Sequence, residues 1–270
     1  MSRKPALCGG LALLVASLVL IVPGRPFAQD VQDVQQLDLK KPKIFDETYQ
    51  LINESDLNCS FYLYEQGKLM PDIQIIGAER MNERAMYDND ALIYINRGAA
   101  DGLEMGQLFL LVGIREVVPK LGTVMKRQGR ARIVRLEDRT AAAKIEKGCG
   151  GVQLGDYLLP FEEEPGEMGK DRGYGDMDPN ASKRGRVVYI EWGFHIAGPG
   201  QWALIDLGRQ HCVQIGDQLN VFYRARPDLP REAVASAIVI DVRGATSTVK
   251  ILGARDIVNI GSEVQINVAR

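Results

Sequence analysis

Four short segments of this chain share one pattern, and that pattern limits the folds open to it. Each has two apolar residues separated by one polar residue, followed by a glycine and then Gln, Asp or Ser; the segments are 103–107, 152–156, 213–217 and 258–262. Glycine adopts positive φ angles easily, so each segment predicts a tight turn leading into a strand. The predicted structural turn residues are Gly106, Gly155, Gly216 and Gly261.

The two halves of the chain repeat each other. Gly98 falls on Gly208 at an offset of 208 − 98 = 110, and Thr140 falls on Thr246 at an offset of 246 − 140 = 106. Short β-type segments punctuated by glycine occur in both halves, which is typical of small barrels or sandwiches. The sequence therefore predicts an all-β protein with two duplicated small β-barrel modules, SH3-like or similar, and a short, partly helical N-terminal arm.

Composition shifts mark the boundaries of these parts. A stretch rich in glycine, proline and charge has almost nothing apolar to bury and predicts a flexible linker. The polar arm is expected to hold a short helix around Asp46 to Glu54 and an added edge strand within Cys59 to Tyr64. The predicted parts are the arm (29–70), the first barrel (71–161), the linker (162–184) and the second barrel (185–270).

The first 28 residues resemble a secretory signal peptide. Arg3 and Lys4 precede an apolar run from Leu11 to Val22 that is too short for a comfortable transmembrane helix. We expect cleavage after Ala28, and an uncleaved membrane anchor is the alternative, because Pro26 stands where a small residue is usual. The sequence predicts export to the periplasm or cell surface of a bacterium, with membrane contact only through an uncleaved signal.

The charge of the exported chain argues against nucleic acid as a partner. The full chain has a formal net charge of −2, and losing three basic residues with the leader gives −2 − 3 = −5. Nucleic-acid binding normally needs a basic surface that displaces counterions from phosphates. We therefore expect no nucleic-acid partner.

The cysteines and histidines leave the redox chemistry open and indicate no metal. Cys59, Cys149 and Cys212 remain after the leader, and either one disulfide with a free thiol or three reduced cysteines is compatible with their spacing. His195 and His211 have no paired ligand at the short spacing typical of zinc sites. We expect no metal site and no bound cofactor.

Two groups of side chains are candidates for an interaction surface. Arg127, Arg130, Arg132 and Arg135 form a basic cluster that is either a solvated barrel face or a contact for an acidic partner or anionic polymer. Strand alternation is expected to place Arg130 and Arg132 on one solvent face. Trp192, Phe194 and Trp202 lie near one another in the second half and either plug the barrel or, if exposed, form a recognition patch.

The glycine turns and their flanking strands resemble a known family. The segments that carry the resemblance are IIGAERMNERAMYDNDALIYINRGAADGLEMGQLFLL, GRARIVRLEDRTAAAKIEKG, VQLGDYLLPF and ALIDLGRQHCVQIGDQLNVFYR. They are similar to the β-rich region that follows LysM in bacterial LysM peptidoglycan-binding domain-containing envelope proteins. They are more weakly similar to the C-terminal barrel of the flagellar assembly protein FlgT. Between Gln29 and Pro71 the chain has no LysM repeat. The resemblance implies an exported tandem of barrels without catalytic residues.

The residues themselves also indicate no catalysis. The chain has no GxSxG segment, and its glycine-rich loops lack the lysine or spacing of phosphate-binding motifs. We predict a non-enzyme that acts as a protein-interaction or assembly scaffold module for an unknown envelope protein. The alternative is a module that binds peptidoglycan or an anionic polysaccharide.

Overall fold

The computed structural model describes residues 48–65, 70–163, 165–176, 178, 182–191, 194–226 and 228–266. The predicted signal peptide (1–28) and most of the predicted arm before Tyr49 lie outside the described residues. The chain from Lys41 to Arg270 forms one compact unit. None of the helices in the described part of the chain has the length and apolar character needed to cross a membrane.

The first barrel closes through six antiparallel strands. Its strand order is β6-β5-β8-β3-β4-β7, and β7 pairs back onto β6. Apolar side chains such as Ile75, Phe109 and Ile145 fill its interior. The strands are β3 (Ile73–Ala78), β4 (Leu92–Ile95), β5 (Leu108–Val118), β6 (Gly122–Leu136), β7 (Ala141–Gly148) and β8 (Tyr157–Pro160).

The second barrel repeats this arrangement with six strands in the order β10-β12-β15-β14-β13-β17. Its core includes Ile205, Leu219 and Val249. A separate two-stranded ribbon, β11 (Ile196–Ala197) with β16 (Val258–Asn259), belongs to the same half. The barrel strands are β10 (Arg184–Ile190), β12 (Trp202–Ile205), β13 (Gln218–Tyr223), β14 (Glu232–Val242), β15 (Ser247–Ala254) and β17 (Glu263–Ile266).

The predicted all-β fold with two barrels is confirmed, and so are the four glycine turns. Gly106, Gly155, Gly216 and Gly261 have φ angles of 81°, 87°, 86° and 90°. Side chains other than glycine's are strained in this region, which explains the recurring glycine. The repeat extends to the short 3₁₀ helices Ala99–Asp101 and Arg209–His211, which end in left-handed residues at Gly102 and Cys212.

The arm differs from its prediction in the position of the helix. Strand β1 (Tyr49–Ile52) occupies the end of the predicted helix, and helix α1 runs from Glu54 to Cys59. Asn53 decides the boundary, because its side chain accepts a hydrogen bond from the Asp56 amide while the Asp56 carboxylate accepts one from the Asn53 amide. The edge strand is present as β2 (Phe61–Leu63), paired with β6.

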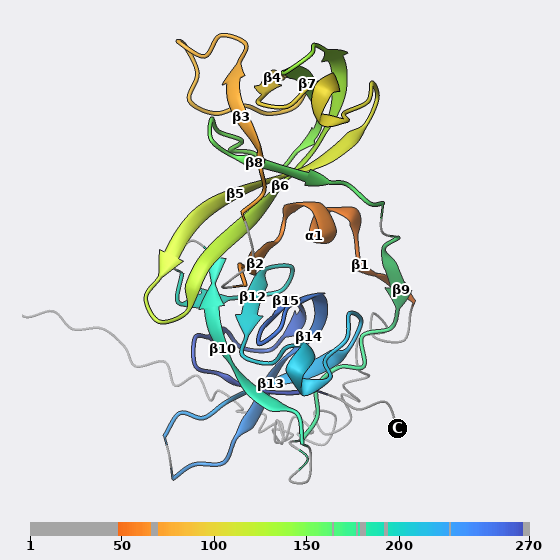
Figure 1. Ribbon diagram of the computed structural model, residues 1–270. Coiled ribbons are helices and arrows are strands. Elements are labelled where there is room, and N and C mark those ends of the chain that lie inside the picture. Colours follow the sequence, from red (N-terminus) through yellow and green to blue (C-terminus); the bar gives the residue numbers. More distant parts are fainter. Residues whose placement is uncertain are drawn as a thin grey trace, which may run out of the picture. The chain divides into compact units, whose positions relative to one another are not determined.

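The arm covers the outside of β14, which explains an unusual stretch of sequence. β14 is buried at nearly every position instead of alternating. Its inward side chains fill the barrel, while Ile238 and Ile240 pack against Leu51 and Ile52 of the arm. A strand buried on both faces is apolar on both faces. Helix α1 contacts both β6 and β14 (Figure 1).

The predicted linker also makes contacts. Strand β9 (Glu167–Gly169) pairs with β1 of the arm, and buried Asp171 accepts a hydrogen bond from Ser236 at 2.8 Å. Backbone pairing with the arm and the buried Asp171 carboxylate therefore hold parts of the linker in place, although the linker has few apolar residues. Flexibility of the rest of the linker stays a prediction.

The structure decides between the two cysteine alternatives. Cys59 and Cys149 form a disulfide that links the end of α1 to the loop after β7, and Cys212 is a free, exposed thiol. The bond therefore joins the arm to the first barrel.

The long hairpin of β5 and β6 joins the two barrels. Val124 packs with Phe61, Tyr189 and Leu204 in one apolar cluster. The Tyr189 hydroxyl donates a hydrogen bond to Glu116 at 2.9 Å. The β5–β6 hairpin therefore forms part of the first barrel and also contacts the second barrel.

Candidate interaction surface

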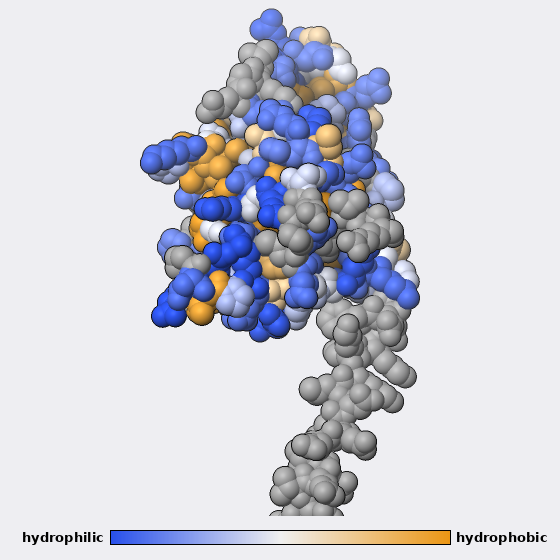
Figure 2. Space-filling model, turned by 90° about the horizontal axis from the view of Figure 1, so that it is seen from below, coloured by the Kyte–Doolittle hydropathy of each residue, from blue (hydrophilic) through white to orange (hydrophobic). Residues whose placement is uncertain are grey.

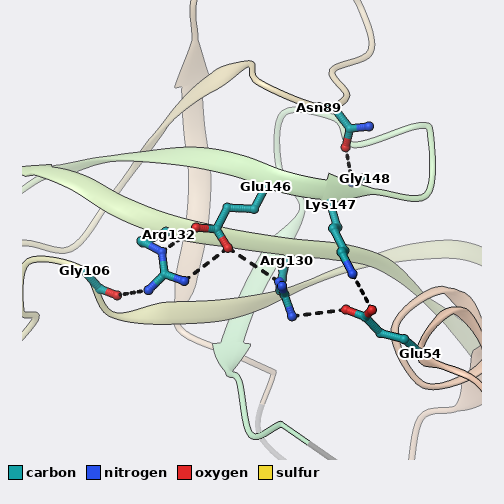
Figure 3. Close-up of polar contacts among 8 residues, drawn as sticks. All are labelled: Glu54, Asn89, Gly106, Arg130, Arg132, Glu146, Lys147 and Gly148. Atoms are coloured by element: carbon teal, nitrogen blue, oxygen red, sulfur yellow. Dashed lines mark hydrogen bonds and ion pairs between the residues drawn. The ribbon is translucent and has the colours of Figure 1, made fainter. Parts of the chain in front are cut away.

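Arg130 and Arg132 of β6 lie on one face and share a carboxylate partner. Both guanidinium groups reach Glu146 of β7, and Arg132 also donates to the Gly106 carbonyl at 2.9 Å (Figure 3). Arg130 additionally pairs with Glu54 of the arm at 3.2 Å. The shared face agrees with strand alternation, although bulges interrupt the register on either side of Arg132.

Local charges on this face are compensated. Hydrogen bonding to Arg132 lowers the pKa of Glu146 despite the opposing effect of burial, and it raises the pKa of Arg132. Hydrogen bonding to Lys147 similarly lowers the pKa of Glu54 (Figure 3). Each pair is favoured in its ionised form, so the arginines already have anionic partners within the protein. Their role in binding another molecule stays a prediction.

The Arg127 side chain does not lie on the face of Arg130 and Arg132; it contacts the second barrel instead. It pairs with Asp241 of β14, donates to Ser60 at 2.9 Å and lies over the Tyr62 ring. Arg243 binds the same carboxylate at 2.7 and 2.9 Å. Burial alone would raise the pKa of Asp241, but the charges and hydrogen bonds of the two arginines outweigh it and lower the pKa. Arg127 therefore has a structural role in this cluster.

Arg135, at the end of β6, is exposed. No ion pair or side-chain hydrogen bond involves it among the residues that the structure describes. The four predicted arginines therefore do not act as one surface: one is buried between the barrels, two are paired and one is free.

Trp202 lies beneath the arm. Its indole nitrogen donates to Asp56 at 3.0 Å, and Lys126 lies over its ring. Lys250 binds the other oxygen of the same carboxylate at 2.6 Å. The side chain is half-buried against arm residues such as Leu51. Trp202 thus packs between the second barrel and the arm instead of joining an exposed aromatic loop.

Phe194 is exposed and has apolar neighbours that the sequence did not single out. In the β11–β16 ribbon, Ala197 and Val258 are buried, so Ile196 points outward. Phe194 lies just before β11 and Ile257 just before β16, and both side chains are exposed. We call Phe194, Ile196, Ile257 and Ile260 the apolar patch; their exposed fractions are 56%, 47%, 49% and 41%. Trp192 lies outside the described residues.

No protein-family model and no curated protein matches this chain. The proposed role therefore depends on the chain's own surface.

An arginine-lined pocket lies next to the apolar patch. It has a volume of about 460 Å³, and Asn259 and Ile260 form part of its wall. We call it the arginine pocket, after Arg186 of β10, Arg224 and Arg226 of the β13–β14 loop, and Arg231 before β14. Among the described lining residues, Glu263 is the acidic one, and their charge is 4 − 1 = +3. The lining is therefore positively charged, whereas the predicted net charge of the mature chain is −5.

A larger cavity of about 630 Å³ is lined by residues of the arm, both barrels and the linker. Among the described residues, its charged lining consists of three arginines and four carboxylates, which gives 3 − 4 = −1. Arg127 and Arg243 are held by Asp241, and Arg130 is held by Glu54. These ion pairs stabilise the joint between the barrels, and the lining has no excess of positive charge to offer an anionic ligand.

Two potential metal ligands, Cys149 and His211, have other roles. Cys149 is in the disulfide, and His211 accepts a hydrogen bond from the Gly208 amide at its 3₁₀ helix. Within the described ranges, no group of three or more His, Cys, Asp or Glu side chains is arranged to hold a metal ion.

Sequence reasoning missed the arginine pocket and most of the apolar patch. Three of the pocket's arginines lie within 224–231, a local signal, but Arg186 is far away in the sequence. The ribbon strands have two residues each, too few to show alternation. Only the tertiary structure brings these elements together.

Proposed function

We propose that this chain is a non-catalytic, exported envelope protein whose second barrel acts as a protein-interaction or scaffold module. The observation that carries the proposal is the apolar patch. Exposed apolar groups gathered on one ribbon and rimmed by charged residues are typical of protein contact sites. Figure 2 shows how hydrophobic and hydrophilic residues are distributed over one face of the molecule.

Two further features support this proposal. The Cys59–Cys149 disulfide suits the oxidising compartment to which the predicted signal peptide would direct the chain. The arm, disulfide and ion-pair cluster tie the barrels together, so the patch would be presented on a rigid support. Pre-organised surfaces lose less conformational entropy on binding.

The test is affinity capture from crosslinked envelope fractions with the mature chain from Gln29 onward. The patch variant is Phe194→Ser with Ile196→Ser, and the matched control is Met86→Ser with Met105→Ser, two exposed apolar residues of the first barrel. We expect reproducible protein partners with wild type and control, and their loss with the patch variant. Equal capture by all three proteins would contradict the proposal.

A second candidate function is binding of peptidoglycan or an anionic polysaccharide. The net positive charge of the arginine pocket favours it, because guanidinium groups bind carboxylates and phosphates through paired hydrogen bonds. Sedimentation with purified peptidoglycan sacculi tests this candidate. Binding to protease-treated sacculi, without reproducible protein partners, would replace the interaction module by a wall-binding one.

A further inference from the structure

We propose that the arginine pocket and the apolar patch form one binding site for an acidic peptide segment of a partner protein. Acidic side chains of the segment would enter the pocket, and an apolar side chain of the same segment would lie on the patch. This inference deepens the proposed function and rests on it.

The geometry places the two features side by side. Asn259 and Ile260 line the pocket, and Asn259 pairs directly with Ile196 of the patch. The Ile260 amide also donates to the His195 carbonyl at 3.1 Å, which fixes the pocket wall to the β11 strand. A single extended segment of a few residues therefore spans both features.

The charges of the pocket favour an anionic occupant. Arg231 has Glu263 as a carboxylate partner and Arg226 has Asp228, and the second of these pairs is highly exposed; Arg224 is also engaged in an interaction. Exposed ion pairs are weak, so an incoming carboxylate competes for the Arg226 guanidinium group with little loss. Arg186 is exposed, and no ion pair involves its side chain among the described residues.

The composition of the patch favours a peptide over a polysaccharide. Three of its four residues are isoleucines, whose branched side chains pack against aliphatic side chains, and Phe194 supplies its single aromatic ring. A pocket of about 460 Å³ is large enough for one or two acidic side chains.

The duplication adds an independent argument. The β13–β14 hairpin, whose loop carries Arg224 and Arg226, corresponds to the β5–β6 hairpin of the first copy. In the first copy this hairpin packs against the other barrel and contributes an ion pair, Lys126 with Glu191. The equivalent hairpin would then make a contact in both copies: with the other barrel in the first copy, and with the peptide in the second.

The experiment selects ligands for the immobilised mature chain from a displayed library of random dodecapeptides. Affinities of the enriched peptides, labelled with fluorescein, are then measured by anisotropy at low and high salt. We expect enriched peptides with at least two Asp or Glu residues beside an aliphatic or aromatic residue, and weaker binding at high salt.

Three variants make the test specific. Arg186→Gln with Arg226→Gln removes two exposed pocket charges, and we expect affinity to fall at least about tenfold. The patch variant Phe194→Ser with Ile196→Ser should weaken binding by a similar factor. Arg84→Gln with Arg139→Gln removes the same charge from the first barrel and should leave affinity unchanged. Matching thermal unfolding curves would show that all variants fold.

The outcomes separate the inference from the proposed function. Enrichment of non-acidic peptides, no enrichment, or affinity unaffected by the pocket variant overturns the inference. Polygalacturonate binding that depends on the pocket but not on the patch, without peptide binding, replaces the peptide by an anionic polysaccharide. If envelope partners are lost with the patch variant but kept by the pocket variant, the proposed function stands and the inference fails. If neither variant loses them, both fail.

Discussion

Asp241 of the second barrel holds Arg127 of the first, and both side chains are about nine-tenths withdrawn from solvent. Arg243 binds the same carboxylate from the neighbouring turn. Two cations therefore share one buried anion at the joint between the barrels. Removal of the anion leaves two charges uncompensated, whereas removal of Arg127 leaves one intact pair.

This asymmetry predicts the order of two stability losses. Asp241→Asn should lower the free energy of unfolding by about 3–5 kcal/mol, as expected when a buried ion pair loses one partner. Arg127→Gln should lower it by less, because Arg243 still neutralises Asp241. Urea unfolding at pH 7 measures both, with the exposed Arg139→Gln as control. A larger loss for Arg127→Gln than for Asp241→Asn would contradict this account.

The lowered pKa of Asp241 predicts a pH dependence. The folded-state pKa lies below the ordinary value of 3.8, so the stabilisation from this carboxylate is fully present above that value. It is lost as pH falls from about 3.8 through the folded-state pKa. The difference in unfolding free energy between wild type and Asp241→Asn should therefore shrink below about pH 4. Unfolding curves at pH 7, 4, 3 and 2.5 check this, and a constant difference would argue against it.

The disulfide predicts a redox-dependent stability. Cys59 and Cys149 are 90 residues apart, and a cross-link of this span typically contributes about 2–5 kcal/mol by restricting the unfolded chain. Cys59→Ser with Cys149→Ser should lower unfolding free energy by that amount and abolish the response to a thiol reductant. Cys212→Ser should keep the response. A wild type indifferent to reductant would count against a disulfide in the folded protein.

The free cysteine predicts a stabilising substitution. Cys212 has φ +54°, whereas the equivalent Gly102 has φ +84° with open space around it. A left-handed residue with a side chain costs about 1–2 kcal/mol, partly offset by the greater unfolded-state entropy of glycine. Cys212→Gly should therefore stabilise the protein by about 0.5–1 kcal/mol, and Gly102→Ala should destabilise it by a similar amount. Thermal unfolding measures both, and a loss of stability in Cys212→Gly would be the opposite result.

Local sequence was a good guide to the strands and a poor guide to the arm. The barrel strands form where the sequence has short apolar segments separated by glycine turns. Such segments can be recognised locally, because turn residues and side-chain alternation involve neighbours in the chain. The helix was expected too early, since the capping interaction between Asn53 and Asp56 outweighs the general pattern around it. The β1 strand forms because β9, more than a hundred residues later, pairs with it.

The candidate surface shows the same division. Alternation along β6 placed Arg130 and Arg132 on one face, yet their partners Glu54 and Glu146 come from the arm and from β7. Arg127, only three residues earlier, is instead directed to the other barrel. Sequence proximity therefore did not indicate which arginines remain available to a ligand.

The sequence by itself determined the duplicated all-β architecture and the four turns, because each depends on residues adjacent in the chain. Only the tertiary structure decided which cysteines pair, which arginine joins the barrels, and that Trp202 lies beneath the arm. It also brought Arg186, the 224–231 loop and the β11–β16 ribbon to one end of the second barrel. Barrel closure sets these long-range neighbours through strand order and register, and neither is encoded in a local pattern.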